Sequence, residues 1–193
     1  TAIDVSWTDG ITVLDSEIRN ADYGVECLSC DHITVDGCVI EDCYTGLVLE
    51  GCEDMTVEDC VFNKDGIYVE GYSLSEYMFT SFSNNTVNGK PIYYVASTSG
   101  YTVPSEAGHV IIVNSTGITI NGVNASYTDV GILVVRSKGV TIRNAVLEHD
   151  DYGILMVLGC EGITVQGGQI SGCEEGISAQ GITGLTAQGL EIT

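Results

Sequence analysis

The chain has few positively charged residues and no long hydrophobic run. Six Lys and Arg stand against 27 Asp and Glu, which gives a formal net charge of −21 over 193 residues. This balance excludes a nucleic-acid ligand, because contact with the phosphate backbone requires clustered basic side chains. No apolar stretch is long enough for a membrane-spanning helix, so we expect no membrane span. The sequence begins with Thr1 and not with Met, from which we expect that a signal segment has been removed and that the protein is extracellular.

An apolar–Thr–apolar tripeptide recurs every 22 or 23 residues, with a single longer gap. Its copies begin at Ile11, Ile33, Met55, Ile118, Val140, Ile163 and Leu185. Each repeat holds three short alternating segments separated by Gly, Asp, Asn and Ser, which leaves no room for a helix. A fixed period in this range indicates one unit stacked on itself. The sequence therefore predicts an all-β fold, a right-handed parallel β-helix (β-solenoid) of about eight turns with three short strands per turn and no capping helix.

We expect a single β-helix domain over residues 1–193. The two aliphatic side chains of each tripeptide should face the interior, and the Thr between them should face outward. The repeat loosens after residue 72, and residues 95–109 are polar and rich in Gly. We therefore expect a protruding loop at about 95–109, either functional or a tolerated surface insertion.

Eight cysteines are candidates for cross-links: Cys27, Cys30, Cys38, Cys43, Cys52, Cys60, Cys160 and Cys173. Cys30 and Cys52 occupy equivalent positions at a turn of neighbouring repeats, and they are the better candidates for a bridge. Cys38 and Cys60 also stack, but their inward position favours packed thiols, because stacked Cβ atoms lie rather far apart for an unstrained disulfide. The other four have no stacked partner and are candidates for disulfides between subunits. Zinc at Cys27 and Cys30 is disfavoured, because no second pair or His set is near.

Acidic residues recur two positions before several tripeptides, at Asp9, Asp31 and Glu53. On adjacent turns these charges repel one another unless they are solvated, screened or bridged by a cation. A calcium site at the three residues is one hypothesis, because oxygen ligands at repeat spacing suit this ion, and a solvated acidic face is the alternative. No other cofactor is expected. Three sequons, at Asn84, Asn114 and Asn124, favour glycosylation and an extracellular, cell-surface location.

The two ends of the chain are complementary in repeat phase. Residues 185–193 supply the first part of a repeat, and residues 3–10 match its closing part. Neither end shows the atypical cap of a monomeric solenoid, and uncapped strand edges pair readily. We therefore predict head-to-tail stacking into a homopolymer. The alternative is a module of a longer protein. The predicted interface consists of Ile3, Val5, Trp7, Leu185, Leu190 and Ile192.

The repeat GITV…N…GI and the phrase NNTVNGKPIYY at residues 84–94 resemble a known family. They are similar to the NosD-type right-handed parallel β-helix repeat proteins of archaeal, particularly methanogen, cell surfaces. The resemblance implies the fold and a surface location. It leaves function open, since such proteins are linked to carbohydrate binding, metalloenzyme maturation and surface layers. The chain departs from the family by having Cys38 and Cys60 where Asn is usual, which favours a covalently reinforced assembly such as a methanogen sheath.

We interpret the chain as a structural extracellular protein, not an enzyme, that self-assembles by stacking and intersubunit disulfides into a filament, sheath or surface layer. One alternative is a carbohydrate-binding module of a larger surface protein, with cell-surface glycans as partners. A second is a polysaccharide lyase or hydrolase, since fold does not fix function. The only cluster that suits hydrolysis is His149, Asp150 and Asp151, and Arg136 or Arg143 are poor lyase candidates.

Overall fold

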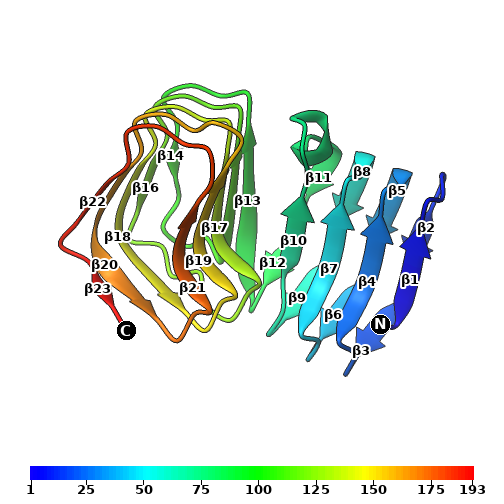
Figure 1. The fold of residues 1–193 in the computed structure, drawn as a ribbon. Helices are drawn as coiled ribbons and strands as arrows, with labels where there is room; N and C mark the ends of the chain where they lie inside the picture. Colours follow the sequence, from blue (N-terminus) through cyan, green and yellow to red (C-terminus); the bar gives the residue numbers. More distant parts are fainter. The chain divides into compact units, whose positions relative to one another are not determined.

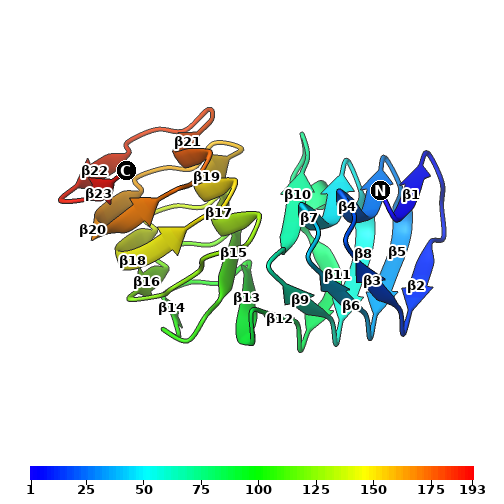
Figure 2. The same cartoon turned by 90° about the horizontal axis from the view of Figure 1, so that it is seen from below.

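The structure is a computed structural model that describes residues 1–193. Parallel strands stacked one repeat apart make up nearly all of it (Figures 1 and 2). The one helix is a short 3-10 turn, η1 (Ser75–Tyr77). The chain divides into two compact units, Thr1–Pro91 and Ile92–Thr193, where the sequence predicted one domain. Each unit is described by itself.

The N-terminal unit consists of three ladders of four parallel strands, so it contains four turns of a β-helix. The first ladder is β1 (Ile3–Ser6), β4 (Tyr23–Leu28), β7 (Thr45–Glu50) and β10 (Ile67–Glu70). The second is β2 (Thr12–Leu14), β5 (Asp31–Asp36), β8 (Glu53–Glu58) and β11 (Phe79–Ser83). The third is β3 (Glu17–Arg19), β6 (Val39–Glu41), β9 (Val61–Asn63) and β12 (Thr86–Val87). At its end, β12 also pairs antiparallel with residues 90 and 91 of the next strand.

The C-terminal unit continues the same architecture over five turns. Its first ladder is β13 (Lys90–Ala96), β15 (His109–Val113), β17 (Val130–Val135), β19 (Tyr152–Val157) and β21 (Glu175–Ala179). Its second is β14 (Thr102–Val103), β16 (Thr119–Asn121), β18 (Thr141–Glu148), β20 (Thr164–Ser171) and β22 (Thr186–Gln188). The long strands β18 and β20 bend and also form the third side, where β23 (Glu191–Ile192) pairs with β20. The predicted all-β parallel β-helix is thus confirmed, with four and five turns in place of the expected eight.

The segment 95–109 is not a protruding loop. Ile92 pairs with His109, so this turn advances the register by 17 residues instead of 22. Within it, β14 pairs with β16, and the side chains of Val103 and Ala107 are buried in the core. The expectation was wrong because a turn of different length breaks the tripeptide period without leaving the β-helix.

Alternation in the strands of the second ladder places the aliphatic side chains inside, as predicted. Ile33 and Val35 are fully buried, and Met55 and Val57 lie directly beside them on the next turn. Thr34 and Thr56 are paired in the same register but are only half-buried. Each interior therefore consists of straight rows of stacked aliphatic side chains, the arrangement that parallel in-register pairing imposes.

The bends between strands depend on residues that tolerate a left-handed backbone. Asp15, Asp59 and Asn144 have φ values of 46°, 51° and 49°, and Asn and Asp adopt this region more readily than other side chains. Tight packing between turns sets a second requirement, near the start of the strands of the first ladder. A Cβ atom on Gly153 would lie 2.6 Å from the carbonyl oxygen of Gly176, so only glycine fits there.

Candidate functional site

A row of polar side chains runs along the outer face of the second ladder in the C-terminal unit. Its register aligns Asn121 with Arg143, Arg143 with Gln166, and Gln166 with Gln188. Neighbouring strands lie ~4.8 Å apart, so the row presents one such side chain on each turn. The in-register stack therefore provides a regular series of hydrogen-bonding groups on the surface.

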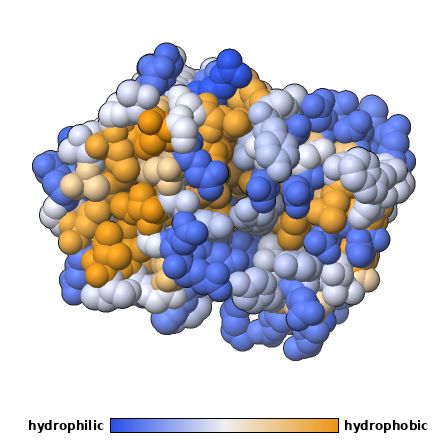
Figure 3. Space-filling model, viewed as in Figure 1, coloured by the Kyte–Doolittle hydropathy of each residue, from blue (hydrophilic) through white to orange (hydrophobic).

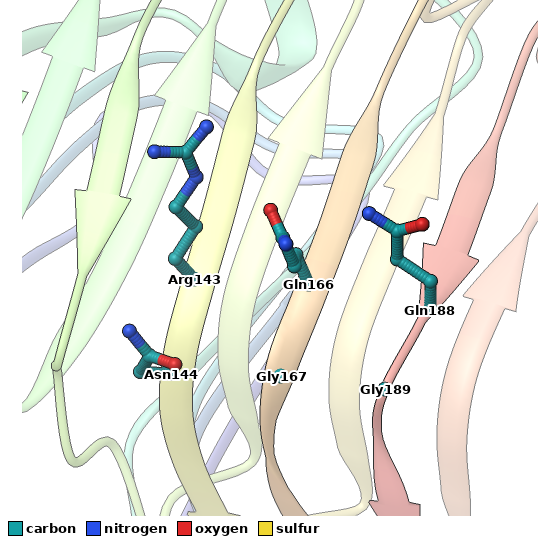
Figure 4. Close-up of a pocket in the computed structure, with 6 residues that line it drawn as sticks. All are labelled: Arg143, Asn144, Gln166, Gly167, Gln188 and Gly189. Carbon is teal, nitrogen blue, oxygen red and sulfur yellow. The ribbon is translucent and has the colours of Figure 1, made fainter.

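A hollow of about 590 Å³ lies along this row. We call it the Arg143 groove, and it is lined by Arg143, Asn144, Gln166, Gly167, Gln188 and Gly189 (Figure 4). Figure 4 shows Arg143, Gln166 and Gln188 extending from their strands in a similar direction, with Asn144 beside Arg143. At the bend below them, Gly167 and Gly189 have φ values of 61° and 64° and carry no side chain. The floor is open at Gly189, whereas a Cβ on Gly167 would lie 2.9 Å from the side-chain oxygen of Asn144.

The long side chains of the Arg143 groove are free to bind a ligand. Arg143, Gln166 and Gln188 are exposed, and none of them makes a side-chain hydrogen bond or an ion pair within the protein. Asn144 differs, because its amide nitrogen donates to the side-chain oxygen of Asn121 at 3.2 Å. The groove thus combines one guanidinium and two amides whose hydrogen-bonding capacity is unused.

The cysteines predicted as cross-links are all free thiols, and seven of the eight are buried. The stacked positions were placed correctly, since Asp31 pairs with Glu53 and so sets Cys30 beside Cys52. Their sulfurs are directed inward and donate to backbone carbonyl groups, as Cys52 does to Cys27 at 3.2 Å. Burial raises the pKa of Cys27 to about 12 and that of Cys52 to about 11. Only Cys173 is partly exposed, so a disulfide between subunits is sterically open to this residue alone.

Two buried carboxyl groups occupy equivalent positions in the two units. Asp65 accepts the backbone N–H of Cys43 at 3.1 Å, and Asp150 accepts that of Thr128 at 3.0 Å. The second carboxyl oxygen of each has no hydrogen-bond partner. Burial raises the pKa of Asp65 to about 7 and that of Asp150 to about 8. His109 is buried without a partner for either ring nitrogen, and this burial lowers its pKa to about 3.

The predicted acidic row exists, but its carboxylates do not converge. Asp9 pairs with Asp31 through the backbone, and Asp31 pairs with Glu53. The carboxylate of Asp9 lies 2.7 Å from Nδ1 of His32, and that of Glu53 accepts a hydrogen bond from Ser75 at 2.7 Å. No group of three or more His, Cys, Asp or Glu side chains is arranged to hold a metal ion. The calcium hypothesis is thus not supported by the geometry, because the carboxylates of Asp9 and Glu53 contact other side chains.

The predicted stacking residues lie at the two ends of the strand ladders. Trp7 is 84% exposed, and Leu185 and Ile192 are 38% and 55% exposed. Ile3, Val5 and Leu190 are half-buried. The three sequon residues, Asn84, Asn114 and Asn124, are all exposed, so glycosylation at them stays a sterically reasonable prediction.

The cluster considered for hydrolysis does not form a catalytic pair. The ring of His149 stacks on Tyr127 with a centroid distance of 4.8 Å. Asp150 is directed into the interior, where it holds the N–H of Thr128. Asp151 is half-buried beside it. A hydrolase needs two carboxyl groups that face one groove. Here Asp150 faces the interior, so it does not form such a pair with Asp151.

Comparison with protein families assigns both parts of the chain. Residues 1–106 match the model of the right-handed β-helix region, and residues 95–193 match that of the periplasmic copper-binding protein NosD. The chain belongs to the NosD-like family of right-handed β-helix proteins. The resemblance seen in the sequence is thus confirmed at the level of family and fold, including handedness.

No curated protein shows significant sequence similarity to this NosD-like chain. Among solved structures, a crystal structure of a mutant of the periplasmic alginate epimerase AlgG is similar, with 10% sequence identity and a TM-score of 0.40. The alignment covers 99% of this chain and 50% of that chain, so the present chain spans half the length of that protein.

The NosD family name refers to copper, but the side chains of this member do not fit a copper site. Copper in proteins is bound by His, Cys and Met side chains that converge on one point. His32 contacts Asp9 and Asp54, His149 stacks on Tyr127, and His109 is isolated in the interior. The cysteine sulfurs donate to backbone carbonyls, and no metal-holding group of His, Cys, Asp or Glu is formed. We therefore derive no role for copper in this chain.

The structure contains no helix that is long and apolar enough to cross a membrane.

The Arg143 groove was missed by the sequence reasoning, which named Arg143 only as a poor lyase candidate. A signal was present, because Arg143, Gln166 and Gln188 each lie three residues after the start of a tripeptide. Reading that outward position along successive repeats would have found the row.

Proposed function

We propose that this NosD-like protein is a non-enzymatic structural protein outside the cytoplasm, whose β-helices stack head to tail into a filament, sheath or surface layer. The observation that carries the proposal is the match in repeat phase between the strands of the last turn and those of the first turn. The periplasmic location in the name of the matched family supports the proposed compartment. A location at the cell surface and contacts with its glycans are parts of the same proposal.

The last turn of the C-terminal unit is open and apolar. Strand β21 pairs only with β19, and both β22 and β23 pair only with β20, so one side of each carries unpaired backbone groups. The end of the interior is exposed there, with Leu185 and Ile192 among the most exposed apolar side chains. Figure 3 shows hydrophobic surface gathered over the part of this unit where β21, β22 and β23 lie in Figure 1. Such an apolar patch with open edges favours pairing with a further turn.

The first turn of the N-terminal unit offers a matching edge. Strands β1, β2 and β3 pair only with β4, β5 and β6. If β1 of a second copy continued the ladder of β21, the repeat phase would place Ile3 of the partner subunit on Ile177 and Val5 of the partner subunit on Ala179. The same phase would set Ile18 of the partner subunit on Ile192. Each apolar row would thus continue across the junction without a shift of register, which in-register parallel pairing requires.

The proposal that the protein is not an enzyme is supported by the arrangement of its titratable groups. Acidic residues are abundant, but the buried pair Asp65 and Asp150 belongs to separate units and each serves a local backbone N–H. The Arg143 groove contains no carboxyl, thiol or imidazole group. A binding surface without an acid or base is consistent with a structural protein.

Electron microscopy and sedimentation of the purified protein in its native length test the proposal. We expect filaments for the wild type and dispersed particles for Ile192→Asp, because a charge on the exposed end of the interior would be buried in each junction. Tyr72→Asp is the matched control, since Tyr72 is 83% exposed and belongs to neither the first nor the last turn. A wild-type protein that stays monomeric at high concentration, or assemblies that Ile192→Asp leaves intact, would contradict the proposal. The first result is expected if the edges are instead covered by further turns of the same polypeptide.

A further inference from the structure

We propose that stacking is regulated by charge, because Glu191 on the last turn of one copy faces Glu17 of the partner subunit across each junction. Repulsion between these two carboxylates weakens the junction at low ionic strength, and salt relieves it. The inference rests on the proposed stacking and adds its regulation. It follows from the register of the third side of the β-helix, from the charges on the two end turns and from the shortage of cations beside Glu17.

Glu17 and Glu191 occupy the same outward position, directly before the apolar residues Ile18 and Ile192. The row at this position consists of Glu17, Val39, Val61 and Thr86 in the N-terminal unit, and of Asn124, Val146, Gln169 and Glu191 in the C-terminal unit. Its acidic members lie only on the first and the last turn, and its other members are neutral. The phase that sets Ile18 of the partner subunit on Ile192 therefore also sets Glu17 of the partner subunit on Glu191.

The last turn is almost free of charge, since Glu191 is the only charged side chain among residues 176–193. The first turn carries four acidic residues, which are Asp4, Asp9, Asp15 and Glu17. In the stacked register the first three of these meet neutral residues of the last turn, which are Ser178, Thr183 and Gly189. Glu17 of the partner subunit is thus the one acid that meets another charge, and that charge has the same sign.

The cation beside Glu17 is already shared between two carboxylates. Within one copy, Nε of Arg19 lies 2.9 Å from the carboxylate of Glu41, and its Nη2 lies 3.5 Å from that of Glu17. The side chain of Glu17 is still 69% exposed, so it is open to a neighbouring copy. Glu191 brings no cation with it, and a junction would therefore place three carboxylates around one guanidinium.

Aligned acidic residues also occur inside the chain, as Asp31 and Glu53 show. That pair is held in place by the surrounding fold, and Ser75 donates a hydrogen bond to Glu53 at 2.7 Å. At a junction the same repulsion acts directly on the equilibrium between free and stacked copies, because no chain connection joins them. Like charges directly opposite each other on neighbouring strands lower such an equilibrium constant by up to about fivefold.

Ionic strength distinguishes this contact from the general repulsion between two chains that each carry a net charge of −21. The screening length is about 8 Å at physiological ionic strength and about 3 Å at 1 M salt. Physiological salt therefore screens most of the general repulsion, whereas carboxylates on strands ~4.8 Å apart still repel each other. We expect stacking to strengthen further between physiological salt and 1 M salt, and we expect this gain to be smaller when one of the two charges is replaced.

Sedimentation of the native-length protein measures the concentration at which assembly begins, for the wild type, Glu191→Lys, Glu17→Lys and the double variant. At physiological salt each single variant should assemble at a concentration about fivefold lower than the wild type or less, because the junction then joins opposite charges. The double variant should need a higher concentration than either single variant, because two lysines then face each other. It has the least negative net charge of the four proteins, so a general charge effect predicts the opposite order. Glu50→Lys is the matched control, because Glu50 is exposed on β7, away from the end turns, and this variant should stay close to the wild type.

Three results would overturn the inference. Assembly of the double variant at a concentration as low as that of the single variants would show a general charge effect. Single variants that behave like Glu50→Lys would show that Glu17 and Glu191 do not meet. In both cases assembly itself is still observed, so the proposed stacking stands. Absence of assembly in all five proteins at every salt concentration would instead contradict the stacking, and the inference with it.

Discussion

Replacing Asp150 by Asn should change how the stability of the protein depends on pH. Asp150 is 3% exposed, and only one of its carboxyl oxygens has a hydrogen-bond partner. The other has no partner, and it lines the same small space at Gly131 as the carbonyl oxygen of Ala125, since a Cβ on Gly131 would be 3.0 Å from each. Burial of a carboxyl group whose second oxygen receives no hydrogen bond disfavours the ionised form and favours a protonated acid or an amide at this position.

Asn85 is a buried amide in a comparable position, and both of its side-chain polar atoms are hydrogen-bonded to the backbone. Its side-chain oxygen accepts the N–H of Cys60 at 3.0 Å, and its amide nitrogen donates to the carbonyl of Val57 at 2.8 Å. The acceptor lies three residues before the donor, as Ala125 lies three residues before Thr128. An Asn at position 150 should therefore use both of its polar atoms, whereas the ionised Asp uses one.

The magnitude follows from the raised pKa. The pKa of Asp150 is raised from 3.8 to about 8, mainly by burial. Between these values the unfolded chain has lost a proton that the folded protein retains, so the free energy of unfolding falls as pH rises, by about 1.4 kcal/mol per pH unit. From pH 5 to pH 8 this amounts to at most about 4 kcal/mol, and the loss is complete above the folded pKa. The Asn variant does not have this contribution.

Urea unfolding of the wild type and of Asp150→Asn at several pH values from 5 to 8 measures the effect. Asp65 adds a slope of the same sign up to about pH 7, and His109, whose pKa is lowered to about 3, adds the opposite slope below its ordinary pKa. The difference between variant and wild type removes both. We expect it to grow in favour of the variant as pH rises. A difference that is constant with pH, or that also appears in the exposed control Asp22→Asn, would refute the reasoning.

Three further predictions concern packing, thiols and metal ions. Gly153→Ala should lower the free energy of unfolding by about 2 kcal/mol, measured by urea denaturation, because its Cβ would lie 2.6 Å from the carbonyl of Gly176. Alkylation of the native protein followed by mass spectrometry should modify Cys173 first and leave buried thiols such as Cys27 unmodified until unfolding. Treatment with a chelator should leave the melting temperature unchanged, since no cluster of metal-binding side chains is formed, and a clear decrease would show that the acidic row binds a cation.

The repeat phase predicted which side chains are buried, because in-register stacking of parallel strands allows few arrangements of the core. The alternation of Ile33, Thr34 and Val35 determined which side chains are buried, and the structure places them as expected. The phase also placed Cys30 beside Cys52. For Cys30 and Cys52 it did not predict that the thiols face inward and donate to backbone carbonyls, since the direction of a side chain at a turn depends on the local backbone conformation and not on the period.

Two departures from the repeat could not be predicted from its period. The turn that contains β14 is 17 residues long, so its strands are out of phase with the tripeptide although their pairing is regular. In β15 and β17 the outward positions are apolar as well, and Ile111 and Leu133 are buried although alternation assigns them to the outside. Continuous apolar runs of this kind are typical of strands that are buried on both faces, and alternation alone does not describe them.

The same register connects the proposed stacking with the Arg143 groove. Gln188 and Gly189 lie on the last turn, so a stacked copy would place Leu14 of the partner subunit over Gln188 and Asp15 of the partner subunit over Gly189. Asp15 has a φ of 46°, which fits the left-handed bend that Gly189 occupies one turn earlier, and it brings a side chain to a floor that glycine leaves open. Stacking would therefore close the groove at this end with an apolar and a negatively charged residue.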